Sequence, residues 1–239
     1  MTANQEALSL AALRRDLRRL AKPGKPKGLQ WFFKTGPGEY AEGDKFIGVM
    51  VPESRAIARR YRELPLREIK QLLRSPWHEE RLVALFILVD QFQRGTETEQ
   101  EAIYELYLRN ARCVNNWDLV DSSAAYIVGP WLEQRSRAVL YRLAQSTSLW
   151  ERRIAIVATH HFIRRRDHRD TLRIAAMLLG DRHDLIHKAC GWMLREVGQR
   201  DAAVLERFLR RHASRMPRTM LRYAIEKLSA PRRRLYLRM

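Results

Sequence analysis

The sequence predicts an all-α protein, an α-α superhelix or solenoid of HEAT-like helical repeats with a concave basic groove. Three observations favour this fold. Apolar residues recur three and four positions apart through most of the chain, turn-forming residues separate these segments, and the segments repeat at a period of 33 to 40 residues. No run alternates polar and apolar residues as a half-buried strand does.

The helical spacing begins after the first fifth of the chain and continues almost to its end. It is clear in "WHEERLVALFILVDQF", "TEQEAIYELYLRNA", "LWERRIAIVATHHFI" and "LIHKACGWMLREV". Proline and glycine interrupt the pattern where helices are expected to end. The breakers are Pro65, Pro76, Gly95, Gly129, Pro130, Gly180, Pro217 and Pro231.

A repeat becomes visible when the expected helix starts are aligned. Trp77 and Trp117 are 40 residues apart, and Trp117 and Trp150 are 33 apart. Such a period fits a unit of two helices that stacks on its neighbours. The same position of each unit is expected to line one groove, which would bind either DNA or a protein partner. The residues at this position are Arg81, Asp121, Arg153, Lys188 and Arg222.

The N-terminal part has a different character. A helix to about Ala21 is followed by the linker "KPGKPKG" and by a section rich in glycine and aromatic residues, expected to be irregular or to form a short helix. We therefore expect an N-terminal helix and linker in residues 1–28, a single repeat domain in residues 29–230 and a basic tail in residues 231–239.

The charge balance indicates an anionic partner. The chain has 45 Lys and Arg against 27 Asp and Glu, a net charge of +18, and nucleic acid is the commonest partner of such an excess. A basic surface without a polyanion partner is the alternative. The longest strongly apolar run, "LVALFILV", is too short to cross a membrane, and no signal peptide is evident, so we expect a cytoplasmic, nucleoid-associated protein.

Metal and disulfide chemistry are not expected. Cys113 and Cys190 are far apart and form no C-x-x-C pair. His160, His161 and His168 lie near one another in the sequence but lack an H-E-x-x-H pattern. The sequence therefore predicts neither a metal site nor a cofactor.

One segment is acidic in this basic chain. In "CVNNWDLVDSSAAYIVGPWL" the only side chains charged at neutral pH are Asp118 and Asp121. On a helix that begins near Asn116, Trp117 and Asp121 share a face, while Asp118 points about 100° away. A carboxylate beside a tryptophan attracts a positive centre, whereas the ordinary alternatives are a core tryptophan and a helix-capping acid.

Four blocks carry a resemblance to a known family: "FFKTGPGEYAEGDKFIGVMVPE", "NNWDLVD", "LWERRIAI" and "HKACGWMLREVG". In this order and spacing they resemble the DNA alkylation repair family, the AlkD-like DNA glycosylases built from HEAT-like repeats. The resemblance covers about Trp31 to Tyr223. It implies functional roles for Trp117, Asp121, Arg153 and Trp192, and for Tyr40.

The resemblance implies hydrolysis of the N-glycosidic bond of cationic alkylated purines, such as 3-methyladenine and 7-methylguanine, without a deep base-flipping pocket. Asp121, Trp117 and Trp192 would form the catalytic set, and double-stranded DNA with alkylated bases would be the substrate of a monomeric enzyme. DNA-binding roles are expected for Arg153, Lys188, Arg81, Arg222 and Tyr40. The alternative is a non-catalytic DNA-binding or scaffold protein with the same repeats.

Overall fold

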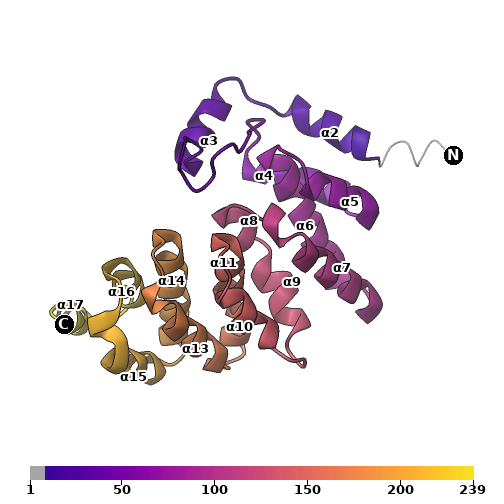
Figure 1. Cartoon of the computed structure of the whole chain (residues 1–239). Coiled ribbons are helices and arrows are strands. Elements are labelled where there is room, and N and C mark those ends of the chain that lie inside the picture. The colour runs from indigo at the N-terminus through magenta and orange to yellow at the C-terminus, as the bar shows by residue number, and fades with distance from the viewer. Residues whose placement is uncertain (1–8) are drawn as a thin grey trace. The chain divides into compact units, whose positions relative to one another are not determined.

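The computed structural model describes residues 9–239, and these fold as helices joined by turns and by one longer irregular segment, residues 34–50 (Figure 1). A single isolated β-bridge pairs Lys45 with Trp77 within this described range. The all-α prediction is confirmed. The chain divides into two compact units, the first ending at Ser123 and the second running from Ala124 to Met239. Each unit is described separately.

Unit 1 is organised around one long helix, α6 (His78–Arg94), which is buried along most of its length. It packs against α4 (Val51–Arg60), α5 (Leu66–Leu73), α7 (Glu97–Arg109) and α8 (Trp117–Asp121). Its central residues, from Leu82 to Leu88, are apolar on every side, as expected of a helix that is covered all round. Before α4 come α2 (Leu10–Arg19) and α3 (Lys25–Phe33), and a 3-10 turn (Ala111–Cys113) follows α7.

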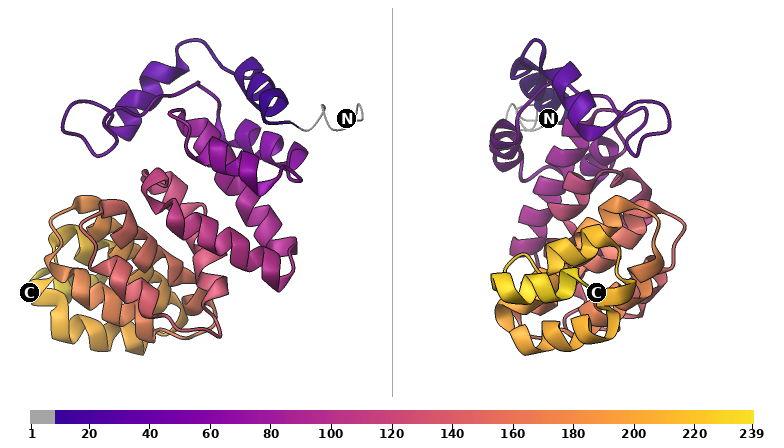
Figure 2. Two further views of the ribbon diagram at one scale, coloured as in Figure 1. Left: turned by 45° about the vertical axis from the view of Figure 1, so that its right-hand side comes forward. Right: turned by 90° about the vertical axis from the view of Figure 1, so that its left-hand side faces the viewer.

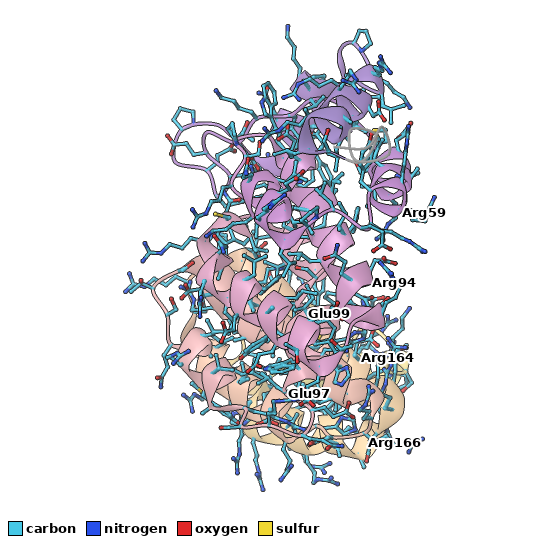
Figure 3. The ribbon with its side chains drawn as sticks, turned by 90° about the vertical axis from the view of Figure 1, so that its right-hand side faces the viewer. Arg59, Arg94, Glu97, Glu99, Arg164 and Arg166 are labelled. Carbon is cyan, nitrogen blue, oxygen red and sulfur yellow. The ribbon has the colours of Figure 1, made fainter. Side chains whose placement is uncertain are left out.

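Local signals set the ends of these helices. Thr96 and Glu99 form a capping box at the start of α7: the Thr96 hydroxyl accepts from the Glu99 N–H, and the Glu99 carboxylate accepts from the Thr96 N–H. Figure 3 labels Glu97 and Glu99 on this first turn. Gly95 separates α6 from α7, as the sequence predicts.

Unit 2 contains two layers of helices. In one, α9 (Ala124–Trp131), α11 (Leu149–Ala158), α14 (Asp184–Arg200) and α16 (Arg218–Ala224) pack one against the next. The other contains α10 (Ala138–Ala144), α13 (Arg169–Met177) and α15 (Ala202–His212), which pack against α11 and α14. Figures 1 and 2 show this stack, which confirms the helical-repeat prediction. The remaining elements are α12 (His160–Arg164), α17 (Ala230–Leu237) and two 3-10 turns (Leu178–Gly180 and Ala213–Arg215).

Close approach between helices of unit 2 depends on two glycines. A Cβ on Gly129 of α9 would lie 2.5 Å from the Cβ of His161, and a Cβ on Gly191 of α14 would lie 2.5 Å from the Cβ of Tyr223. No side chain fits at either crossing. The neighbouring helices can therefore approach until their backbones nearly touch.

Both the expected linker and the expected basic tail contain helix. Helix α3 begins inside the expected linker, and most of residues 231–239 lie in α17, where Tyr236 is buried. Residues 1–8 of the expected N-terminal region lie outside the described residues. The domain boundaries at residues 28 and 230 stay a prediction. Within residues 9–239 no helix combines the length and apolar character needed to cross a membrane.

Candidate functional site

Helix α8 presents the tryptophan and carboxylate that the sequence singled out. Asn116 caps the helix, because its side-chain oxygen accepts from the N–H of Trp117 at 2.8 Å. Trp117 and Asp121 are the first and last residues of α8, four positions apart, and both are half-buried. The helix therefore begins at the expected position, with the two residues on one face.

The Trp117 ring is supported by aromatic side chains of α3. Phe33 stacks on it with ring centroids 5.4 Å apart, and Phe32 meets it edge-on at 5.9 Å. Phe33 is buried and also contacts the ring of His78 at 4.8 Å, whereas Phe32 is 55% exposed. Sequence reasoning did not assign these phenylalanines to the site, although they stand at the start of one of the resembling blocks.

His78 lies beneath this aromatic group and is 2% exposed. Its Nδ1 lies 3.0 Å from an oxygen of Asp44, and its Nε2 lies 2.8 Å from an oxygen of Asp118. Burial alone would lower the pKa of His78, but the charges and hydrogen bonds of Asp118 and Asp44 outweigh it and raise the pKa to about 9. His78 is therefore a cation at neutral pH and donates to both carboxylates.

Arg81 belongs to the same buried group, which corrects the expectation that it lines an exposed cationic groove. Its side chain is buried, and its two terminal nitrogens donate to Asp44 at 2.5 Å and to the carbonyl of Ser75 at 2.9 Å. Despite its burial, Asp44 has a lowered pKa, because His78 and Arg81 both stabilise its charge. We call His78, Arg81, Asp44 and Asp118 the ionic cluster.

Two further acids next to the ionic cluster fasten the N-terminal segment to α6. The carboxylate of Glu79 accepts from the N–H groups of Ile47, Gly48 and Val49 at 2.8, 2.8 and 3.2 Å. Glu80 pairs with Arg14 and Arg18 of α2. The first turn of α6 thus holds three neighbouring parts of unit 1 in place: α2, the segment before α4, and α8, which carries Trp117.

Tyr40 lies between α3 and α4, where the N–H of Ala41 donates to the carbonyl of Lys34. The tyrosine side chain is partly buried. Its role in binding DNA stays a prediction.

In unit 2 the predicted residues stand on successive helices of one layer. Arg153 of α11 is 5% exposed, and its Nη1 donates to the carbonyl of Leu185 at 2.5 Å, which ties α11 to the start of α14. Lys188 of α14 pairs with Asp184 at 2.7 Å and keeps 41% of its side chain exposed. Arg222 of α16 is exposed. The repeat alignment therefore placed these three cations on adjacent helices, but Arg153 is more buried than expected.

Trp192 lies one turn after Lys188 on α14. It is half-buried, and its ring lies 5.8 Å from that of His160. His160 in turn lies 3.8 Å from Glu196. Gly191, the residue before Trp192, is where α14 meets α16.

Within residues 9–239 the structure contains no group of three or more His, Cys, Asp or Glu side chains placed to hold a metal ion. Both cysteines are free thiols, and Cys190 is buried.

The fold is that of a helical-repeat protein, with a tryptophan and a carboxylate on α8 and with Arg153, Lys188 and Arg222 on adjacent helices of unit 2. The sequence model of the family described as DNA alkylation repair enzyme matches residues 13–228, and the chain belongs to that family. A solved structure described as a predicted DNA alkylation repair enzyme from Enterococcus faecalis has a similar fold. The TM-score is 0.67 at 17% sequence identity, over 87% of this chain and 97% of that one. No curated protein matches the sequence. Family membership gives the protein a role in DNA repair, with DNA as its substrate.

Proposed function

We propose that the protein is a DNA glycosylase that hydrolyses the N-glycosidic bond of cationic alkylated purines, of the 3-methyladenine and 7-methylguanine type, in base excision repair. The observation that carries this proposal is the pairing of Asp121 with Trp117 on one face of α8. A hydrogen bond between His78 and Asp118 joins this helix to the ionic cluster. This contact fixes the positions of Trp117 and Asp121.

Cleavage of this bond requires little catalytic assistance from the protein. A purine alkylated on a ring nitrogen is positively charged and leaves as a neutral base, taking the electrons of the broken C–N bond, so acid catalysis is not required. Positive charge then develops on the deoxyribose, and water adds to its C1′ and loses a proton. The carboxylate of Asp121 is suited to stabilising this charge and to orienting the water. Trp117 contributes a cation–π attraction of about 0.5–2 kcal/mol.

The residues of unit 2 are proposed to hold the DNA. Trp192 packs against the sugar and backbone, while the exposed Lys188 and Arg222 attract phosphates. Arg153, with its partner in α14, completes the cationic set of adjacent helices. Tyr40 is proposed to approach the lesion from the N-terminal part.

The protein is further proposed to act as a monomer on double-stranded DNA, at the nucleoid, and to leave the base outside any deep pocket. Because release depends on the positive charge of the base, neutral lesions should be poor substrates.

Release of free 7-methylguanine from methylated DNA tests the proposal. Wild-type protein should release it, and Asp121→Asn should lose about 10²-fold or more in single-turnover rate, the scale of removing one preorganised electrostatic stabiliser. Glu101→Gln, which neutralises an exposed carboxylate of α7, is the matched control and should keep the wild-type rate. Equal rates for Asp121→Asn and wild type would remove Asp121 from the mechanism.

The alternative is a DNA-binding or scaffold protein without catalysis. It predicts that wild-type protein binds methylated duplex but releases no base, with Asp121→Asn binding as tightly as wild type. That result would contradict glycosylase activity on this substrate.

A further inference from the structure

Unit 2 contains a pocket of about 690 Å³ in its other helix layer, built by α13, α15 and the loop before α13. None of the residues assigned to the proposed glycosylase site lines it. The arginines around it are Arg165, Arg166, Arg169, Arg173, Arg207 and Arg211. This volume lies within the range of about 300–1,000 Å³ that is usual for small-molecule sites.

Helical spacing explains how the pocket combines charge with an apolar floor. On α13, Arg169, Leu172, Arg173 and Ala176 follow at intervals of three, one and three residues and so share a face. On α15 the same spacing brings together Val204, Arg207, Phe208 and Arg211. The arginines therefore form a rim above aliphatic and aromatic side chains.

The positive charge of this rim is only partly compensated. Asp167 is the one acid among the lining residues, and it already pairs with Arg137 and Arg169. Within the described chain, Arg207 and Arg211 make neither a hydrogen bond nor an ion pair, and both are exposed on α15. Clustered like charges repel one another, so a bound anion would stabilise this surface.

The loop before α13 adds two unusual features. Arg166 has a left-handed backbone, with φ of 60°, and Figure 3 shows it at the surface of unit 2. His168, which follows in the same loop, is 9% exposed, and its Nδ1 is buried without a hydrogen-bond partner among the described residues. A buried polar atom without a partner destabilises the folded state, and a hydrogen bond to a ligand would offset this cost.

We propose that this pocket binds a nucleotide unit. Arg207 and Arg211 hold its phosphate, with Arg166 closing the rim, and the base lies against Leu172, Val204 and Phe208. His168, which also lines the pocket, would offer its unpartnered Nδ1 to the ligand. A bare anion would leave the apolar floor unused, whereas a base has a π-face that packs on apolar and aromatic side chains.

A nucleotide unit can come from a free nucleotide or from a single-stranded nucleic acid. Both present the same phosphate and base. The proposal is independent of the glycosylase activity, since it uses other residues of the chain.

Isothermal titration calorimetry with ADP tests the free nucleotide, and fluorescence anisotropy with a labelled single-stranded oligothymidylate tests the strand. We expect Arg207→Glu combined with Arg211→Glu to weaken binding of at least one probe about tenfold or more. The control is Arg59→Glu combined with Arg67→Glu. This pair makes the same charge change at exposed arginines of α4 and α5 and should have a smaller effect. Circular dichroism checks that both variants are folded.

A second variant distinguishes binding of the base from binding of the phosphate. Val204→Trp fills the floor and leaves every arginine, so it should weaken ADP binding about tenfold and leave pyrophosphate binding unchanged. If ADP and the oligonucleotide both bind, either source fits; if one alone responds to the variants, that one is the ligand. Absence of binding by both probes, or loss in the control pair equal to that in the pocket pair, would overturn the proposal. The proposal would also be overturned if Val204→Trp changed the binding of neither ADP nor pyrophosphate. That result would indicate a site for anions only.

Discussion

Trp117 in unit 1 and Trp192 in unit 2 are held by different kinds of interaction. Both are half-buried and both have a histidine nearby. Trp117 stacks on Phe33, and Phe33 contacts His78 of the ionic cluster. Trp192 follows Gly191, where α14 lies too close to α16 for any side chain. The first position depends on paired charges, and the second depends on the close approach of two helices.

The two histidines show this difference in their protonation. Asp118 and Asp44 raise the pKa of His78 to about 9 in spite of burial. Burial lowers the pKa of His160, and the charge of Glu196, 3.8 Å away, does not compensate. His78 is therefore a buried cation at neutral pH, and His160 is neutral. Stability should respond to pH with opposite sign at the two sites.

Removal of His78 should have the largest effect. His78→Ala leaves the buried Asp44 and the partly buried Asp118 without their shared cation, and breaking a buried ion pair costs about 3–5 kcal/mol. Urea unfolding followed by circular dichroism measures the loss. His160→Ala is the comparison and should cost distinctly less, because its ion-pair contact is long and its partner Glu196 also pairs with Arg200. Equal losses would mean that the two tryptophan sites are not held differently.

The pH dependence of His78 should be the next largest effect. Its folded-state pKa of about 9 lies above the unfolded value of about 6.5, so its stabilisation is complete below pH 6.5 and is lost as the pH rises through 9. The free energy of unfolding should fall by about 3 kcal/mol over this interval. Urea titrations at a series of pH values would show it, and His78→Ala should flatten the curve. A decline of the same size in that variant would assign the effect to other groups.

Much of unit 2 could be predicted from the sequence, because local spacing determines it. The repeat period placed Arg153, Lys188 and Arg222 on neighbouring helices. In unit 1, the expected helix start near Asn116 likewise placed Trp117 and Asp121 on one face of α8. The ionic cluster could not be predicted in this way. Its bonds join residues 34 and 40 positions apart, and one sequence does not specify such pairs.

A local signal for the cluster was nevertheless present. The run "HEER" places four ionisable residues directly before "LVALFILV". A helix with so apolar a sequence is expected to be buried, and charged residues at its buried start must then be paired. The repeat alignment treated Arg81 as an exposed groove residue, and the burial of the whole first turn of α6 is why that expectation was wrong.

Gly191→Ala tests the packing that holds Trp192. The added methyl group would meet the Cβ of Tyr223 and the carbonyl oxygen of Met220, at 2.5 and 2.6 Å, so α14 and α16 would have to separate. Overpacking of this kind costs about 1–3 kcal/mol, measured by thermal or urea unfolding. Gly198→Ala on the same helix mainly meets the flexible end of Leu205 and should cost less, because that side chain can move. A stabilised Gly191→Ala variant would show that the close helix contact is not required.

His160 should have the smallest effect, and it acts on the acid side of the pH profile together with the other histidines whose pKa burial lowers, His161, His168, His183 and His212. Because the folded-state pKa of His160 is lowered, its contribution is complete above the unfolded value of about 6.5 and is lost as the pH falls below it, when the unfolded chain binds the proton more readily. His160→Gln removes this proton binding and keeps a polar side chain near Trp192. The variant should therefore lose less stability than wild type between pH 6.5 and 5, while both should keep the same decline toward pH 9. If its acid slope matches that of wild type, burial does not lower the pKa of the partly buried His160, and the contrast with His78 fails.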